Sequence, residues 1–208
     1  MIDQHIALLA FDAKDATKTD WALVAQAAES LGLIANAKVS PGLMSLVVRA
    51  PEFFPSPNQP ITRDVIRAAA NAIVALGRIG HEPVLEEARR ILDLSPDGCP
   101  AEIRAASAFS YGRLAPANGK ANDASKMFGI YESIYESGAT KFEALKALGN
   151  LRHTPAAARL QSIAREQASI ELRWIAHWSW ERCSGQKAAY TPPTERRAPP
   201  VSITDTTK

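Results

Sequence analysis

The sequence predicts an all-α protein of about nine helices, and two observations carry this prediction. Apolar residues recur at helical spacing along most of the chain, whereas the alternation of apolar and polar residues typical of a strand is nearly absent. Helix starts expected at Thr62, Ala101 and Thr140 lie 39 residues apart, which indicates an internal repeat of helix pairs. Because one pair cannot bury its apolar face alone, we expect about four such units stacked in a row.

The N-terminal part of the chain predicts two helices and a linker. Residues 19–35 place apolar side chains on one helical stripe, namely Trp21, Val24, Ala28 and Leu31. Ser40 is expected as the N-cap of a second, short helix, with Pro41 at its first position. Residues 49–60 contain four prolines and are therefore predicted to form an irregular linker.

The repeats themselves are expected from Thr62 onwards. One helix starts there, and its partner follows Pro83 and ends before the turn residues 95–98. The next pair is predicted over about 101–114 and 122–137. The second of these helices carries Ile134 and Tyr135 on its apolar stripe, together with Met127, Phe128 and Tyr131.

The last repeats have clear helix-start signals. Thr140 and Glu143 form a potential capping box, in which each side chain reaches the backbone amide of the other residue. Thr154-Pro155 starts the partner of that helix. Ser169 is expected to cap a final helix that ends at Gly185.

Residues 1–184 are interpreted as one domain, with residues 62–183 as its most regular part. Residues 185–208 contain four prolines, few large apolar residues and the basic pair Arg196-Arg197, so they are predicted to form a flexible tail. Within the domain, small residues separate the leucines of residues 144–151, namely Ala144, Ala147 and Gly149. Such side chains let neighbouring helices approach closely.

Two helices share a pattern that resembles a known repeat family. Residues 104–112 and 141–149 both start with a basic residue, continue with small residues and end with an aromatic residue or leucine before glycine. This resembles the first helix of HEAT or HEAT-like (armadillo-type) repeats, which reads Arg-x-x-Ala-x-x-Ala-Leu-Gly. In the last helix, Trp180-Glu181 stands where Leu-Gly is expected. The resemblance implies a right-handed α-solenoid of stacked antiparallel helix pairs.

The composition restricts the possible functions. A net charge of +2 with interleaved acidic and basic residues is a weak basis for binding nucleic acid. Cys99 and Cys183 lie 84 residues apart without a ligand spacing, so we expect buried thiols and no metal or cofactor. No apolar run is long enough for a membrane span, and residues 1–11 lack the features of a secretory signal. The predicted location is the cytoplasm.

The sequence favours a protein that is not an enzyme. It contains no GxSxG, HExxH, P-loop or GxGxxG motif. Of the four histidines, His81 and His153 occupy equivalent turns, each four residues after a glycine, so the repeat explains both.

The final helix carries the candidate partner-binding residues, which are Arg173, Trp174, His177, Trp178 and Trp180. Tryptophan and arginine are enriched in binding hot spots. One interpretation is that these heavy side chains close the end of the solenoid. The other is that no second helix follows this one, so its stripe is left for the tail, for another chain or for a ligand. If the tail covers this stripe, Tyr190 and the proline pairs would dock on the tryptophans.

The predicted function is a protein–protein interaction module, such as a scaffold, an adaptor or an assembly subunit. Two alternatives come from HEAT-like families. Alkylpurine DNA glycosylases use tryptophans and an acidic residue in a basic groove, but the final helix here offers Glu171 and Glu181 and no aspartate. Bilin lyase-type chaperones are the other alternative, and the resemblance to them is only generic.

Overall fold

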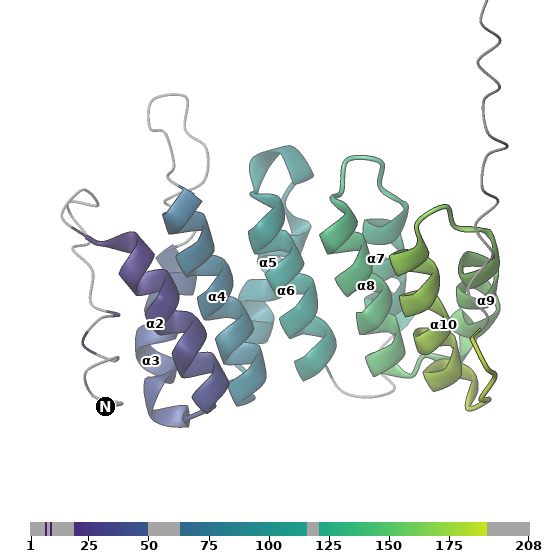
Figure 1. The fold of residues 1–208 in the computed structure, drawn as a ribbon, viewed down its shortest axis with the longest axis horizontal. Helices are drawn as coiled ribbons and strands as arrows, with labels where there is room; N and C mark the ends of the chain where they lie inside the picture. The colour runs from purple at the N-terminus through teal and green to yellow at the C-terminus, as the bar shows by residue number, and fades with distance from the viewer. Residues whose placement is uncertain (1–6, 8, 10–18, 50–62, 116–120, 191–208) are drawn as a thin grey trace, which may run out of the picture.

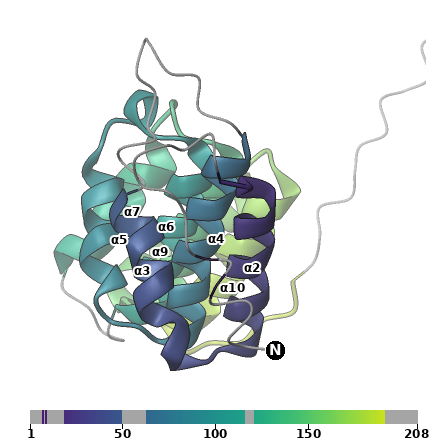
Figure 2. The same ribbon diagram turned by 90° about the vertical axis from the view of Figure 1, so that its left-hand side faces the viewer.

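The protein forms two rows of helices (Figure 1). The computed structural model describes residues 7, 9, 19–49, 63–115 and 121–190. Within these residues there are nine α-helices and no strand, which confirms the predicted all-α fold. Viewed from the end of the molecule, the two rows lie side by side (Figure 2).

The helices alternate between the rows along the chain. The front row contains α2 (Trp21–Ile34), α4 (Arg63–Ile79), α6 (Ala101–Leu114), α8 (Gly138–Leu151) and α10 (Ile170–Ser184). The back row contains α3 (Ser40–Arg49), α5 (Val84–Asp93), α7 (Ala121–Glu132) and α9 (Ala157–Glu166). Short 3-10 turns occupy Ala37–Val39, Pro96–Gly98 and Thr154–Ala156. This arrangement is solenoid-like.

Each front-row helix packs on the next, and each back-row helix packs mainly on the front-row helix that follows it. Helix α5 contacts α6 far more than it contacts α4, and α3, α7 and α9 pack in the same way on α4, α8 and α10. A packed unit is therefore a back-row helix followed by a front-row helix. As a result α10 has a back-row partner, α9, although no helix follows α10 in the described part of the chain.

Four glycines set the spacing of the front row, and we call their contacts the glycine contacts. Each glycine faces a small residue of the next front-row helix, in the pairs Gly32–Ala75, Gly77–Ser110, Gly112–Ala147 and Gly149–Ser179. A Cβ atom on Gly112 would lie 2.5 Å from the Cα of Ala147, and one on Gly149 would lie 2.8 Å from the Cα of Ser179. These positions therefore have no room for a methyl group, because the obstacle is backbone.

Two serines strengthen the glycine contacts with hydrogen bonds. The hydroxyl of Ser110 donates to the carbonyl oxygen of Ile73 at 2.7 Å, and that of Ser179 donates to the carbonyl oxygen of Leu145 at 2.8 Å. In both cases the acceptor lies one helical turn before the contact glycine. The hydroxyls are fully buried, so these bonds also satisfy groups that would otherwise be costly to desolvate.

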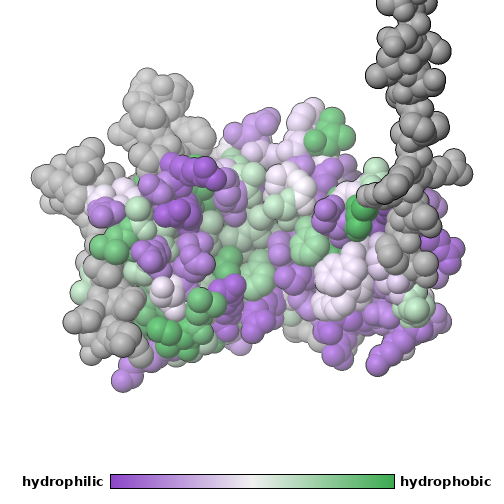
Figure 3. Space-filling model, in the orientation of Figure 1, coloured by the Kyte–Doolittle hydropathy of each residue, from purple (hydrophilic) through white to green (hydrophobic). Residues whose placement is uncertain are grey.

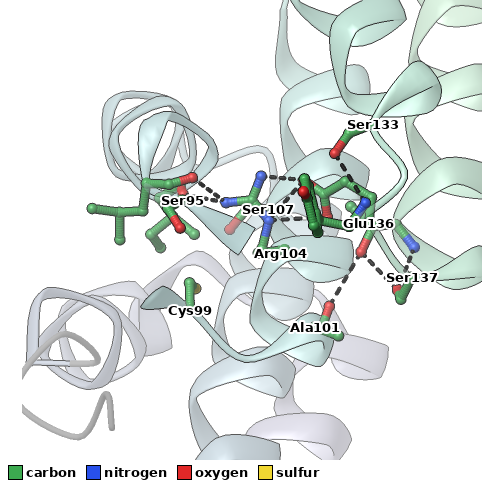
Figure 4. Close-up of polar contacts among 12 residues, drawn as sticks. Ser95, Cys99, Ala101, Arg104, Ser107, Ser133, Glu136 and Ser137 are labelled. Carbon is green, nitrogen blue, oxygen red and sulfur yellow. Dashed lines mark hydrogen bonds and ion pairs between the residues drawn. The ribbon is translucent and has the colours of Figure 1, made fainter. Parts of the chain in front are cut away.

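A buried ion pair joins three segments of the chain (Figure 4). Arg104 of α6 is 2% exposed, and its Nε lies 2.9 Å and 3.1 Å from the two carboxylate oxygens of Glu136. Its Nη1 donates to the carbonyl oxygens of Leu94 at 2.7 Å and Ile91 at 3.1 Å, at the end of α5. Arg104 is the basic residue of the HEAT-like pattern, and here it connects the end of α5, α6 and the segment before α8.

The structure corrects the prediction for residues 122–137. Helix α7 ends at Glu132, and Ile134 and Tyr135 are 82% and 71% exposed instead of lying on a buried stripe. The cause lies in the connection itself, where Glu136 turns inward to pair with Arg104. The hydroxyl of Ser133 also accepts a hydrogen bond from the amide of Tyr135 at 3.3 Å.

Two predicted helix starts also differ. Helix α8 begins at Gly138, because Ser137 accepts from the amide of Thr140 at 3.1 Å and so takes the capping role. Glu143 then pairs with Lys146 instead of closing a capping box. Ser40 is already helical, since Asn36 caps the 3-10 turn that leads into α3.

Other predicted boundaries are confirmed. Ser169 caps α10, and Gly185 ends α10 with a φ of 72°. The first predicted helix, over residues 19–35, is α2, and its N-cap is Asp20. His81 and His153 both lie in turns between helices. The linker was predicted over residues 49–60, but Arg49 is the last residue of α3. Residues 50–60 and Thr62 lie outside the described residues.

The glycine contacts predict opposite effects for two Gly→Ala changes. Gly112→Ala should lower the free energy of unfolding by about 1–3 kcal/mol, because the methyl group would collide with the α8 backbone. Gly129→Ala in α7 should raise it by up to about 1 kcal/mol, because that site is open and alanine favours helix. Urea denaturation of both variants measures the difference. Equal effects at the two sites would contradict the packing argument.

Removing the charge of Glu136 from the buried ion pair should destabilise the protein strongly. Glu136→Gln should lower the free energy of unfolding by about 3–5 kcal/mol, because it leaves the buried guanidinium of Arg104 without a counter-charge. The matched control is Glu132→Gln, which removes the exposed pair with Arg159 and should cost less than about 1 kcal/mol. Chemical denaturation of the two variants compares them directly.

Candidate functional site

A groove of about 810 Å³ crosses α4, α6, α8 and the start of α10 on the front row. We call it the front groove. Its floor is made of apolar residues, namely Ala70, Val74, Ala105, Ala106, Phe109, Ala139, Phe142 and Leu172. In Figure 3, pale and green surface crosses the middle of this face, with hydrophilic side chains above and below it.

Charged side chains form the edges of the front groove. Three carboxylates lie in the first two turns of successive front-row helices, Glu102 of α6, Glu143 of α8 and Glu171 of α10. The cations are Arg78 at the end of α4 and Lys146 in α8. The Nζ of Lys146 lies 3.3 Å from the Glu143 carboxylate and 5.0 Å from the ring centre of Phe109. An apolar floor with charged edges is typical of a surface that binds other molecules.

Of the predicted site residues, Trp174 extends this groove. Its side chain is 49% exposed, and its ring stacks on Phe142 with centroids 6.4 Å apart and planes 10° apart. Because Phe142 lines the groove, the two rings form one aromatic surface that reaches from α8 onto α10.

The other two tryptophans contribute mainly to packing. Trp180 is 7% exposed and belongs to the core. Trp178 is half-buried, lies close to Gly149, and has the guanidinium of Arg182 4.8 Å from its ring centre. The sequence therefore placed three tryptophans together, but the structure exposes mainly Trp174.

Arg173 and His177 lie outside the front groove. Arg173 is half-buried, and its Nε has no hydrogen-bond partner among the described residues. The Nε2 of His177 lies 2.9 Å from the carbonyl oxygen of Ala188, and its ring centre lies 5.2 Å from that of Tyr190. The amide of Ala188 also donates to Glu181 at 3.2 Å.

Residues 186–190 thus return over the end of α10. Tyr190 lies on His177 instead of on the tryptophans, and the proline pairs that were expected to dock there lie outside the described residues. Helix α9 covers another side of α10. The stripe that the sequence left open is therefore partly covered by the chain itself.

The groups available for chemistry are few in the described part of the chain. No group of three or more His, Cys, Asp or Glu residues there could hold a metal ion. Burial raises the pKa of the Cys99 thiol to about 12 and that of the Cys183 thiol to about 11. Both side chains are buried, as the sequence predicted. None of the described helices is long and apolar enough to cross a membrane.

Comparisons with known proteins define the class but not the family. No family model matches the chain, and no curated protein matches it. Among solved structures, it is similar to the crystal structure of an engineered protein, a target of the Northeast Structural Genomics Consortium, with a TM-score of 0.50 and 18% identity. The match covers 88% of this chain and 78% of that chain. At this identity the likeness concerns the fold alone, so the chain is an all-α, solenoid-like protein.

Glu143 predicts a pH-dependent gain in stability. Burial raises its pKa above the ordinary carboxyl value, and Lys146 only partly opposes this effect. Folding therefore favours the protonated form of Glu143. Below the ordinary carboxyl pKa this group does not lower the free energy of unfolding, but it does so increasingly as the pH rises through its higher pKa in the folded protein. We expect Glu143→Gln to raise the free energy of unfolding at pH 7. The gain should vanish below a pH of about 4, and urea denaturation at both pH values tests this.

Proposed function

We propose that this protein is a non-enzymatic interaction module that binds a protein partner in the front groove. The observation that carries the proposal is the aromatic surface of Phe142 and Trp174 at the end of an apolar groove that crosses four helices. On the sequence resemblance, we further propose that its repeats are HEAT-like and that it acts in the cytoplasm as a scaffold, adaptor or assembly subunit.

The dimensions of the front groove suit a segment of a protein. Neighbouring packed helices lie about 8–10 Å apart, so a groove from α4 to α10 is about 25–30 Å long. A helix of about 20 residues or an extended segment of about nine residues spans that length. Interfaces of this kind have an apolar centre and a polar rim, as the groove has.

The edge charges support a protein partner over a nucleic acid. A phosphate backbone in the front groove would face Glu102, Glu143 and Glu171 along one side. Those carboxylates would repel it, and the net charge of +2 adds little long-range attraction. A protein partner can place its own cations at this edge.

The test is to remove the exposed aromatic ring and to compare it with a matched apolar residue elsewhere. Trp174→Ala should weaken binding of a partner, identified by affinity capture and then purified, by at least about 30-fold or about 2 kcal/mol. The control is Leu33→Ala on α2, which is 70% exposed and does not line the groove. Isothermal titration calorimetry with the purified partner measures both variants.

Two results would contradict the proposal. One is a partner that binds wild type and Trp174→Ala equally but loses affinity for Leu33→Ala. The other is turnover of a substrate by the purified protein, such as release of alkylated bases from duplex DNA or attachment of a bilin to an antenna protein, which would favour the alternative functions.

A further inference from the structure

A second hollow, of about 460 Å³, adjoins the front groove at the C-terminal ends of the front-row helices. Arg78 lines both hollows, so its side chain lies between them. The second hollow also contains Arg113 of α6 and Arg182 of α10, with Asn150 of α8 between them in chain order. We call Arg78, Arg113 and Arg182 the arginine row.

The glycine contacts explain why the arginine row lies along one edge of the front row. Arg78 follows Gly77 and Arg113 follows Gly112, while Arg182 follows Glu181, which stands in the corresponding position of α10. Because the front-row helices are in the same register at these contacts, the residues that follow point along one edge of the row. Adjacent positions are therefore about 8–10 Å apart, which is the spacing of packed helices.

The positive charge of this edge is available to a ligand. None of the described residues that line the second hollow is acidic. Arg78 and Arg113 are exposed, and neither forms an ion pair with another described residue. Arg182 is held in place by its Nε, which donates to the carbonyl oxygen of Gly149 at 3.1 Å, and by the ring of Trp178.

The two edges of this face therefore carry opposite charges. Carboxylates lie near the N-terminal ends of α6, α8 and α10, and the arginine row lies at the C-terminal ends. Along α6, the eleven residues from Glu102 to Arg113 separate the two edges by about 16 Å. The apolar floor of the front groove lies between them.

We propose that the arginine row binds carboxylate side chains of the protein segment in the front groove, so that the partner is a segment with an acidic edge. This inference rests on the proposed function and adds the chemistry of the partner. Arginine favours carboxylates because its planar guanidinium can donate two parallel hydrogen bonds to them. Acidic residues about three apart in an extended segment, or about seven apart in a helix, match the spacing from Arg78 to Arg113. Arg182 lies two helices beyond Arg113, with Asn150 of α8 between them, so reaching it takes about twice that separation.

A ten-residue glutamate peptide with a fluorescent label tests the row on its own. Fluorescence anisotropy at low salt should show binding to the wild-type protein, whereas a ten-residue lysine peptide should not bind. The double change Arg78→Ser and Arg113→Ser should weaken binding of the glutamate peptide at least tenfold. The control, Arg63→Ser with Arg165→Ser, removes the same charge from two exposed arginines that do not line either hollow.

The outcomes separate this inference from the proposed function. No binding of the glutamate peptide, or an equal loss in both double variants, would overturn the role of the row. Tighter binding of a labelled DNA duplex that is lost in the row variant would replace the acidic protein segment by nucleic acid and overturn the inference. Trp174→Ala, by contrast, should leave binding of the glutamate peptide unchanged, so failure of the Trp174 test alone counts against the proposed function and not against the row.

Discussion

Close approach between neighbouring front-row helices is the constraint on which the rest of the structure depends. Four glycines meet a small residue of the next helix, and two of those residues are serines that bond to the backbone they touch. With the helices this close, one register is repeated from α2 to α10. The series stops at Glu181, where no further front-row helix follows in the described part of the chain. The Glu181 carboxylate accepts a hydrogen bond from the amide of Ala188, so a side chain stands at the position where glycine faces the next helix elsewhere.

The packing of the back row explains why polar groups are buried in the middle of the molecule. Helix α5 packs on α6, so the next unit encloses the carbonyl oxygens at the end of α5. These oxygens therefore need hydrogen-bond donors from the protein. Arg104 supplies them through Nη1, and Glu136 from the connection before α8 neutralises its charge. One side chain therefore closes the end of a helix in one unit and fixes the connection in the next. Alanine and leucine side chains could not do this, because they have no hydrogen-bond donors for the carbonyl oxygens of α5.

The sequence predicted the helices well because their signals are local. Ser169 and Gly185 each act within a few residues of themselves, and the helix that they bound is the one expected. The connection between α7 and α8 could not be predicted in this way. Glu136 lies 32 residues from Arg104, and only the stacked structure shows that it turns inward and leaves Ile134 and Tyr135 exposed. The same holds for the site, since the clustering of tryptophans was visible in the sequence but the floor from α4 and α6 was not.

The opposite charges on the two edges of the front groove have a simple physical origin. Carboxylates stabilise the N-terminal end of a helix and arginines its C-terminal end, because each opposes the helix dipole. In a bundle of alternating helices these preferences cancel across a face. Here all front-row helices run in the same direction (Figure 1), so the preference acting on α6 and α10 places their carboxylates at one edge and their arginines at the other. Helix α8 has no acidic residue in its first turn and no basic residue in its last turn. For helix stability alone, however, an arginine at any position of the last turn would serve. Arg78 and Arg113 instead both follow a contact glycine, Arg182 follows Glu181 at the corresponding position of α10, and all three line one hollow.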